Sequence, residues 1–72
     1  MRPNALLHNP SSAYLRGLIE TAGVSHREAA RMLGLSWNGF HNYLRNESDP
    51  LYRPATYCVQ FALECLACEA SQ

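Results

Sequence analysis

Residues 25–44 read SHREAARMLGLSWNGFHNYL, and this stretch decides the fold. Ala30 lies four positions before Gly34, and three large apolar residues follow the glycine at helical spacing: Leu35, Phe40 and Leu44. Glycine adopts the left-handed backbone of a tight turn without strain, and a small alanine lets a second helix cross closely over the first. The pattern therefore predicts two short helices joined by a tight turn, a helix-turn-helix, with its large apolar residues buried.

The second of these helices has an outward face of polar and aromatic side chains. Because its apolar residues face inward, five others point outward: Trp37, Asn38, His41, Asn42 and Arg45. In a helix-turn-helix, the N-terminal part of this helix reaches base edges in the major groove of DNA. Asn38 and Asn42 share a face and suit bidentate pairing with adenine, while Arg45 suits a guanine or a phosphate. His41 suits a base or a phosphate, and Trp37 suits a thymine methyl group or a sugar.

Further polar residues near the motif predict contacts with the DNA backbone. Ser36 and Arg27 suit phosphates, which fix the register of a protein on DNA without reading its sequence. Arg53, in the loop that follows the motif, completes the predicted DNA-binding set. Two alternatives stay open. One is that these side chains form a merely solvated face, against which the large aromatic Trp37 argues, and the other is that Trp37 folds back onto the third helix.

Composition indicates one small domain and gives a mixed signal on nucleic acid. The chain has 72 residues, and a chain this short often needs oligomerisation to be stable. Its formal net charge is zero, whereas DNA-binding domains are usually basic. All six basic residues are arginine, however, and four of them lie in or near the motif, whereas Glu64 and Glu69 fall in the predicted last helix. An overall neutral chain can therefore carry a basic face.

The whole chain predicts an all-α domain of about four helices. Residues 1–10 contain two prolines and form an irregular N-terminal arm, expected to be disordered or packed on a dimer, and residues 11–69 form the domain. Caps and periodicity place the first helix from Ser11 or Ser12 to about Ala22, and the second from near His26, after a Ser25–Glu28 capping box, to Gly34. The third helix is predicted at 37–45 after Ser36, and the fourth at about 55–67 after Pro54. Gly39, inside the third helix, indicates close packing or close approach to a ligand.

The predicted last helix is apolar on more than one side. Between Cys58 and Ala67 only Gln60 and Glu64 are polar, and they lie one turn apart on one edge. A helix with such a wide apolar arc must be covered on two sides, and a second copy of the chain is the simplest cover for the second side. The sequence therefore predicts a homodimer through this helix, with the interface residues Tyr57, Cys58, Phe61, Ala62, Cys65 and Leu66.

Other functional classes find little support. Cys65 and Cys68 have a C-x-x-C spacing, but zinc needs four convergent ligands, so we expect buried thiols and no metal. The histidines have no carboxylate or nucleophile at a useful spacing, and no glycine-rich phosphate loop is present, so we expect no enzymatic activity, no cofactor and no small-molecule ligand. No apolar run is long enough to cross a membrane and no signal-peptide pattern occurs, so we expect a cytoplasmic protein without a membrane partner.

The sequence also resembles a known family. The resemblance is carried by YLRGLIETAGVSHREAARMLGLS at 14–36 and by YRPATYCVQFALECLA at 52–67. The family is that of the anti-CRISPR-associated regulators, small helix-turn-helix repressors of phages and mobile elements. It implies a homodimer that binds an inverted repeat in the promoter of an anti-CRISPR operon, in a bacterial host cell, and represses that operon and its own gene. Arg27 matches a DNA-contacting arginine of the family, whereas Glu28 replaces the next one and His41 stands where the reading helix has another.

Two functional hypotheses follow. The first is a sequence-specific dimeric repressor whose partner is a palindromic operator in double-stranded DNA, because a two-fold dimer places two reading helices about 34 Å apart. The second is an antitoxin-like or other protein-interaction module whose apolar last helix covers a different protein. The apolar helix motivates both hypotheses, and the zero net charge favours the second.

Overall fold

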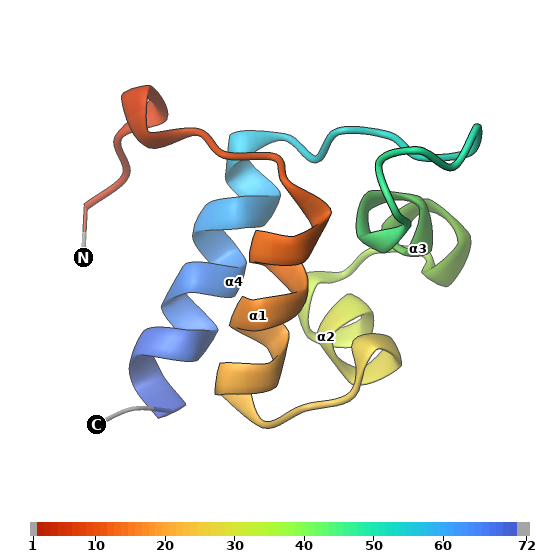
Figure 1. The fold of residues 1–72 in the computed structure, drawn as a ribbon. Helices are drawn as coiled ribbons and strands as arrows, with labels where there is room; N and C mark the ends of the chain where they lie inside the picture. The colour runs from red at the N-terminus through yellow and green to blue at the C-terminus, as the bar shows by residue number, and fades with distance from the viewer. Residues whose placement is uncertain (1, 71–72) are drawn as a thin grey trace.

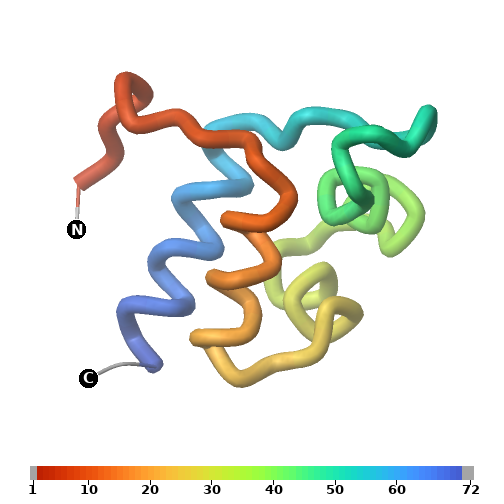
Figure 2. The backbone as a smooth tube through the Cα atoms, in the orientation of Figure 1, coloured from red at the N-terminus to blue at the C-terminus, as the bar shows by residue number. Residues whose placement is uncertain are grey.

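The computed structural model describes residues 2–70, which fold into four α-helices and one short 3₁₀ turn, with no strand in that range. The elements are η1 (Ala5–Leu7), α1 (Ser12–Ala22), α2 (His26–Leu33), α3 (Trp37–Leu44) and α4 (Tyr57–Ala70). Helices α1 and α4 lie side by side and run in the same direction, and α2 and α3 pack on one side of this pair (Figure 1). Figure 2 traces the loop that leads from the end of α3 back to the start of α4. The predicted all-α fold is confirmed.

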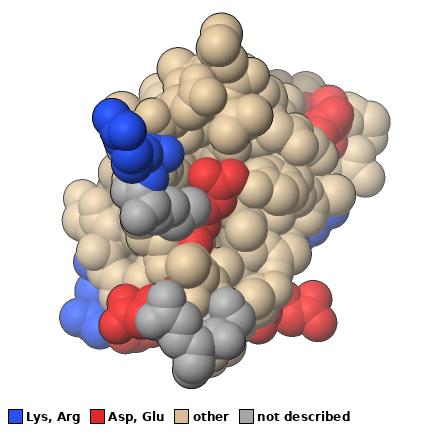
Figure 3. Space-filling view, turned by 90° about the vertical axis from the view of Figure 1, so that its left-hand side faces the viewer, with Lys and Arg blue, Asp and Glu red and all other residues tan. Residues whose placement is uncertain are grey.

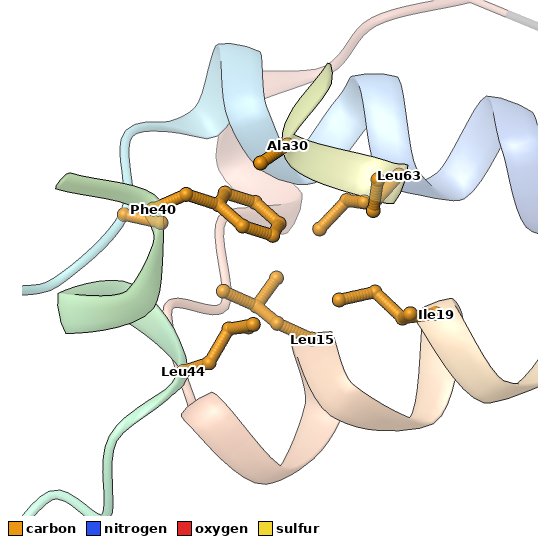
Figure 4. Close-up of a cluster of buried hydrophobic side chains, with 8 residues drawn as sticks. Leu15, Ile19, Ala30, Phe40, Leu44 and Leu63 are labelled. Carbon is orange, nitrogen blue, oxygen red and sulfur yellow. The ribbon is translucent and has the colours of Figure 1, made fainter. Parts of the chain in front are cut away.

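One hydrophobic core joins all four helices. Its buried members are Leu15 and Ile19 from α1, Ala29 and Ala30 from α2, Phe40 and Leu44 from α3, and Ala55 and Leu63 from the α4 region (Figure 4). The predicted burial of Ala30, Phe40 and Leu44 is confirmed. Leu35 is only half-buried, because it follows the turn and packs on the edge of the core beside α4.

Serine caps begin both helices of the motif, as predicted. The Oγ of Ser25 accepts the backbone N–H of Glu28 at 3.0 Å, and the Oγ of Ser36 accepts that of Gly39 at 3.3 Å. These bonds satisfy backbone donors that a helix N-terminus otherwise leaves without a partner. The capping box at Ser25 is only half formed, however, because the Glu28 carboxylate pairs with the guanidinium of Arg31.

Gly34 forms the turn between α2 and α3. Its φ is 72°, and the N–H of Leu35 donates to the carbonyl of Ala30 at 2.9 Å, so α2 ends in a Schellman motif. The left-handed conformation predicted for this glycine is therefore confirmed. At the other end of the motif, α3 ends at Leu44 rather than at the predicted Arg45, whose backbone is already extended.

The boundaries of α4 differ from those predicted. The helix runs from Tyr57 to Ala70 and not from about Ala55 to Ala67. Thr56 explains the later start, because its carbonyl accepts the N–H of Gln60 at 3.2 Å and its Oγ1 accepts the N–H of Val59 at 3.4 Å, which makes it the N-cap. Pro54 therefore lies in the irregular segment before the helix, and not at its first position.

Two polar side chains fix α3 and α1 to their neighbours. The guanidinium of Arg16, on α1, donates to the carbonyl of Leu44 at 2.6 Å, where it satisfies a terminal carbonyl of α3. The carboxylate of Glu47 accepts the N–H of Ser12 at 3.3 Å, at the start of α1. The C-terminal end of α3 is thus attached to the α1–α4 pair.

The N-terminal arm lies against the start of α4. Gln60, only 1% exposed, accepts the N–H of Asn9 with Oε1 at 2.7 Å and donates to the carbonyl of Leu7 at 3.0 Å. Three further hydrogen bonds join Asn4 to the Tyr57 hydroxyl, His8 to the Ala55 carbonyl and the Tyr52 hydroxyl to the Pro10 carbonyl. The expected disorder is therefore corrected for residues 4–10. On the polar edge of α4, Gln60 thus faces this arm, whereas the half-buried Glu64 accepts the hydroxyl of Tyr14 from α1.

Candidate nucleic-acid interface

Three side chains stack on the outer surface of α2 and α3. The Cζ of Arg27 lies 4.5 Å from the centroid of the Trp37 ring, and the His41 ring lies 4.9 Å from that of Trp37 at an interplanar angle of 30°. Trp37 is half-buried and packs against the hydrophobic core, whereas Arg27 is exposed. Trp37 thus lies back along α3, which is the alternative that the sequence left open for this residue, and its ring does not project into solvent.

Arg27, Asn38 and His41 keep unused hydrogen-bonding groups. Arg27 and Asn38 are exposed, and among residues 2–70 neither side chain has a hydrogen bond or an ion pair. The imidazole of His41, which is half-buried, makes only its ring contact within the same residues. Guanidinium, carboxamide and imidazole groups together offer donors for phosphates and donors and acceptors for base edges. The start of α3 and the adjoining turn of α2 therefore present free polar groups to a ligand.

Asn42 and Arg45, by contrast, are held by each other and by the following loop. The Oδ1 of Asn42 accepts a hydrogen bond from the Nε–H of Arg45 at 3.0 Å, and the Nη1 of Arg45 lies 3.4 Å from the Oδ2 of Asp49. Both carboxylate and guanidinium are about one-third exposed, at 33% and 28%. Sequence reasoning did not include Asp49, although its position four residues after Arg45 is the spacing of a local ion pair.

Ser36 and Arg53 also have partners within the chain. The Oγ of Ser36 is engaged in the N-cap of α3, and the Nη1 of Arg53 donates to the carbonyls of Tyr52 at 2.8 Å and Pro50 at 3.4 Å. Arg53 is nevertheless exposed. Gly39 is exposed too, and a Cβ there would lie 3.2 Å from the Ser36 Oγ, a tight contact with the N-cap hydroxyl and not with the core.

The charges on the motif leave one arginine without an acidic partner. Arg31 pairs with Glu28, and this hydrogen bond lowers the pKa of the Glu28 carboxyl. Arg45 pairs with Asp49. In the part of the chain that the structure describes, Arg27 is therefore the only arginine of residues 25–45 that no carboxylate neutralises. The basic surface of the motif centres on this residue.

The predicted dimer residues lie on or near the outward side of α4. The helix buries Gln60, Leu63 and Ala67, whereas Cys58 is exposed and Tyr57, Phe61, Ala62, Cys65 and Leu66 are half-buried. Leu66 packs on the core, Tyr57 packs on the arm, and the Phe61 ring centroid lies 6.0 Å from that of Tyr57. We call Cys58, Phe61, Ala62 and Cys65 the outer face of α4. The side of the molecule that carries α4 and the arm is mostly uncharged (Figure 3). The dimer stays a prediction.

The thiols of Cys65 and Cys68 are less buried than predicted. Cys68 is exposed and Cys65 is half-buried, because the outward side of α4 carries them. Between residues 2 and 70, no three His, Cys, Asp or Glu side chains come together as a metal site requires. Over the same residues, no helix has the length and apolar character needed to cross a membrane.

Comparison with known proteins leaves the chain without an assigned family. No family model matches it, and no curated protein matches it either. Its function is therefore inferred from the sequence pattern and from the geometry of α2 and α3.

Proposed function

We propose that this chain is a sequence-specific DNA-binding protein that acts as a dimeric transcriptional repressor. One observation carries the proposal. On a helix-turn-helix whose ends are capped and whose inner face is part of the core, Arg27, Asn38 and His41 offer hydrogen-bonding groups that no described residue occupies. The DNA backbone and the base edges of the major groove supply the matching acceptors and donors.

The free side chains have distinct roles in this proposal. The start of α3 enters the major groove, where Asn38 pairs with a base edge, preferably that of adenine, and His41 donates to a base or a phosphate. Arg27, at the start of α2, binds a phosphate, and the exposed Arg53 binds another. Asn42 and Arg45 take part only if the contact between Arg45 and Asp49 opens.

A second copy of the chain completes the proposed repressor. Two copies joined through the outer face of α4 would present their α3 helices about 34 Å apart, one helical turn of DNA, on an inverted repeat. Bound there, the dimer would block RNA polymerase sterically. The resemblance to anti-CRISPR-associated regulators suggests that the inverted repeat lies in the promoter of an anti-CRISPR operon and that the protein also represses its own gene, in the cytoplasm of a bacterial host.

A gel shift and a footprint on the DNA upstream of its own gene, across a salt series, test the proposal. We expect a complex that unrelated DNA does not displace, with protection over an inverted repeat. Arg27→Ala should reduce the slope of log K against log salt by about 1, and Asn38→Ala should cost about 1–3 kcal/mol and relax specificity at one position of each half-site. The matched control is Arg2→Ala, at an exposed arginine of the arm, which should change neither the salt slope nor the affinity. Equal displacement by any DNA would overturn the proposal.

A protein-interaction module is the second candidate, because the arm and α4 expose apolar surface. Leu6 is 93% exposed and Leu7 is 65% exposed, in an arm that hydrogen bonds attach to Tyr57 and Gln60 of α4. Size-exclusion chromatography with light scattering separates the two functions. A dimer that Phe61→Glu converts to a monomer favours the repressor, whereas aggregation or a partly unfolded monomer indicates that a different protein covers this surface.

A further inference from the structure

We propose that Trp37 is a positioning residue for DNA binding. Its ring holds the guanidinium of Arg27 and the imidazole of His41 in place before DNA arrives, and it does not contact DNA itself. The inference rests on the proposed function and concerns the organisation of that same surface. It replaces the contact between Trp37 and a thymine methyl group or sugar that the sequence suggested.

The geometry gives Trp37 two stacking partners from two helices. Arg27 is the second residue of α2, and its Cζ lies 4.5 Å from the Trp37 ring centroid. His41 lies one turn further along α3, with its ring centroid 4.9 Å from that of Trp37. Trp37 is the first residue of α3, directly after the Ser36 cap, and it packs on the hydrophobic core. The core thus holds one side of the Trp37 ring, while its other contacts are Arg27 and His41, the two side chains proposed to bind DNA.

Stacking suits a guanidinium that must bind a phosphate. The interaction with an aromatic ring uses the flat face of the guanidinium, so the N–H groups along its edge stay available. A long exposed side chain otherwise loses much rotamer freedom on binding, and restriction in the free protein reduces that cost. Arg27 has no carboxylate partner among the described residues, so the ring of Trp37 is the contact that orients it.

The chain offers a contrast in the way it holds arginines. Arg31 and Arg45 are held by the carboxylates of Glu28 and Asp49, which occupy N–H groups and offset their charge. The Cζ of Arg27 lies over the Trp37 ring instead, and among the described residues no hydrogen-bond acceptor engages its N–H groups and no carboxylate offsets its charge. A group held in this way is preorganised for an anion, and the acceptor with the right chemistry on the proposed partner is a phosphate of the DNA backbone.

The first test measures binding of Trp37 variants to the footprinted duplex. Trp37→Leu should weaken binding about tenfold, whereas Trp37→Phe, which retains an aromatic face, should lose about threefold or less. Thermal unfolding of each variant checks that it is folded. In a background of Arg27→Ala with His41→Ala, the effect of Trp37→Leu should fall to within about twofold, because its partners are gone. An undiminished effect in that background would mean that Trp37 contacts DNA itself, and wild-type affinity of Trp37→Leu would equally overturn the inference.

A second variant does not disturb the core. Arg27→Lys keeps the charge on an exposed position but has no planar face, so we expect binding about fivefold weaker with an unchanged salt slope. If Arg27→Lys binds the duplex as tightly as the wild-type protein, the inference is overturned. The wild-type protein separates this failure from that of the proposed function. If it does not distinguish the upstream duplex from a scrambled duplex of the same composition, both proposals fail; if it does and the variants match it, only the role of Trp37 fails.

Discussion

The guanidinium of Arg45 suits a base edge or a phosphate of DNA, but Asn42 and Asp49 hold it in contacts within the chain. Asp49→Asn should release it and strengthen DNA binding about two- to fivefold, the range expected from one partly exposed ion pair. Asparagine retains the Oδ1 that accepts the N–H of Leu51 at 2.8 Å, so the loop should keep its shape. Fluorescence anisotropy on the footprinted duplex measures the change, and Asp49→Asn combined with Arg45→Ala is the control that should cancel it. Weaker binding of the single variant would instead mean that Asp49 orients Arg45 toward DNA.

The hydroxyl of Tyr14 couples the α1–α4 contact to pH. It donates to the Glu64 carboxylate, and this hydrogen bond, with burial and the charge of Glu64, raises the pKa of Tyr14 from 10.0 to about 12. Because the folded-state pKa is the higher one, the stabilisation is complete below about pH 10 and is lost as the pH rises toward 12. Tyr14→Phe should lower the free energy of unfolding by no more than about 1 kcal/mol at neutral pH. Urea titrations of both proteins should converge across that alkaline range, and a constant difference would contradict the assignment.

At the scale of the elements, predictions based on local patterns were accurate. Ser25, Gly34 and Ser36 act on backbone groups within a few residues of themselves, so the sequence alone placed the ends of α2 and the start of α3. The start of α4 was wrong because Pro54 and Thr56 are competing start signals two residues apart. The sequence did not predict that the capping box is only half formed. Glu28 has two possible partners, the backbone N–H of Ser25 and the guanidinium of Arg31, and it pairs with Arg31.

Two glycines should respond in opposite ways to the same substitution. Gly17 lies within α1, and a Cβ added there would meet nothing within 4 Å, so Gly17→Ala should stabilise the domain by about 1 kcal/mol and raise Tm by about 4–8 °C. A Cβ on Gly34 would be equally unobstructed, but the φ of 72° is left-handed, so Gly34→Ala should destabilise by about 1–2 kcal/mol. Thermal unfolding measures both changes. Shifts of the same sign would show that backbone conformation does not decide the effect.

The whole molecule contains contacts that no local pattern could predict. The sequence shows Gln60 and Glu64 only as the polar edge of an apolar helix, and nothing near Gln60 in sequence indicates that an arm more than fifty residues away buries it. The stack on Trp37 likewise joins α2 to α3 across the turn. Such pairings depend on how complete helices pack, and the spacing within one helix carries no record of them.

Gln60 should hold the arm in solution. Gln60→Met preserves the side-chain volume but removes the bonds to Asn9 and Leu7, so the domain should lose about 1 kcal/mol of stability. The larger effect should be local, with faster hydrogen exchange at the Asn9 amide than in the wild-type protein. Exchange at the Phe40 amide, in the core, is the internal control and should change little. Unaltered protection of Asn9 would mean that the other bonds of the arm suffice.

The attachment of the arm has a consequence for the order of folding. Its hydrogen bonds join residues 42 to 53 positions apart, whereas the bonds that shape α2 and α3 span a few residues. Closing a long loop costs more entropy than closing a short turn, so the pair of α2 and α3 can nucleate early while the arm docks late. The arm is synthesised before the helix on which it docks, yet it is among the last segments to find its partners. Substitutions that weaken this docking should accelerate unfolding and leave the refolding rate nearly unchanged.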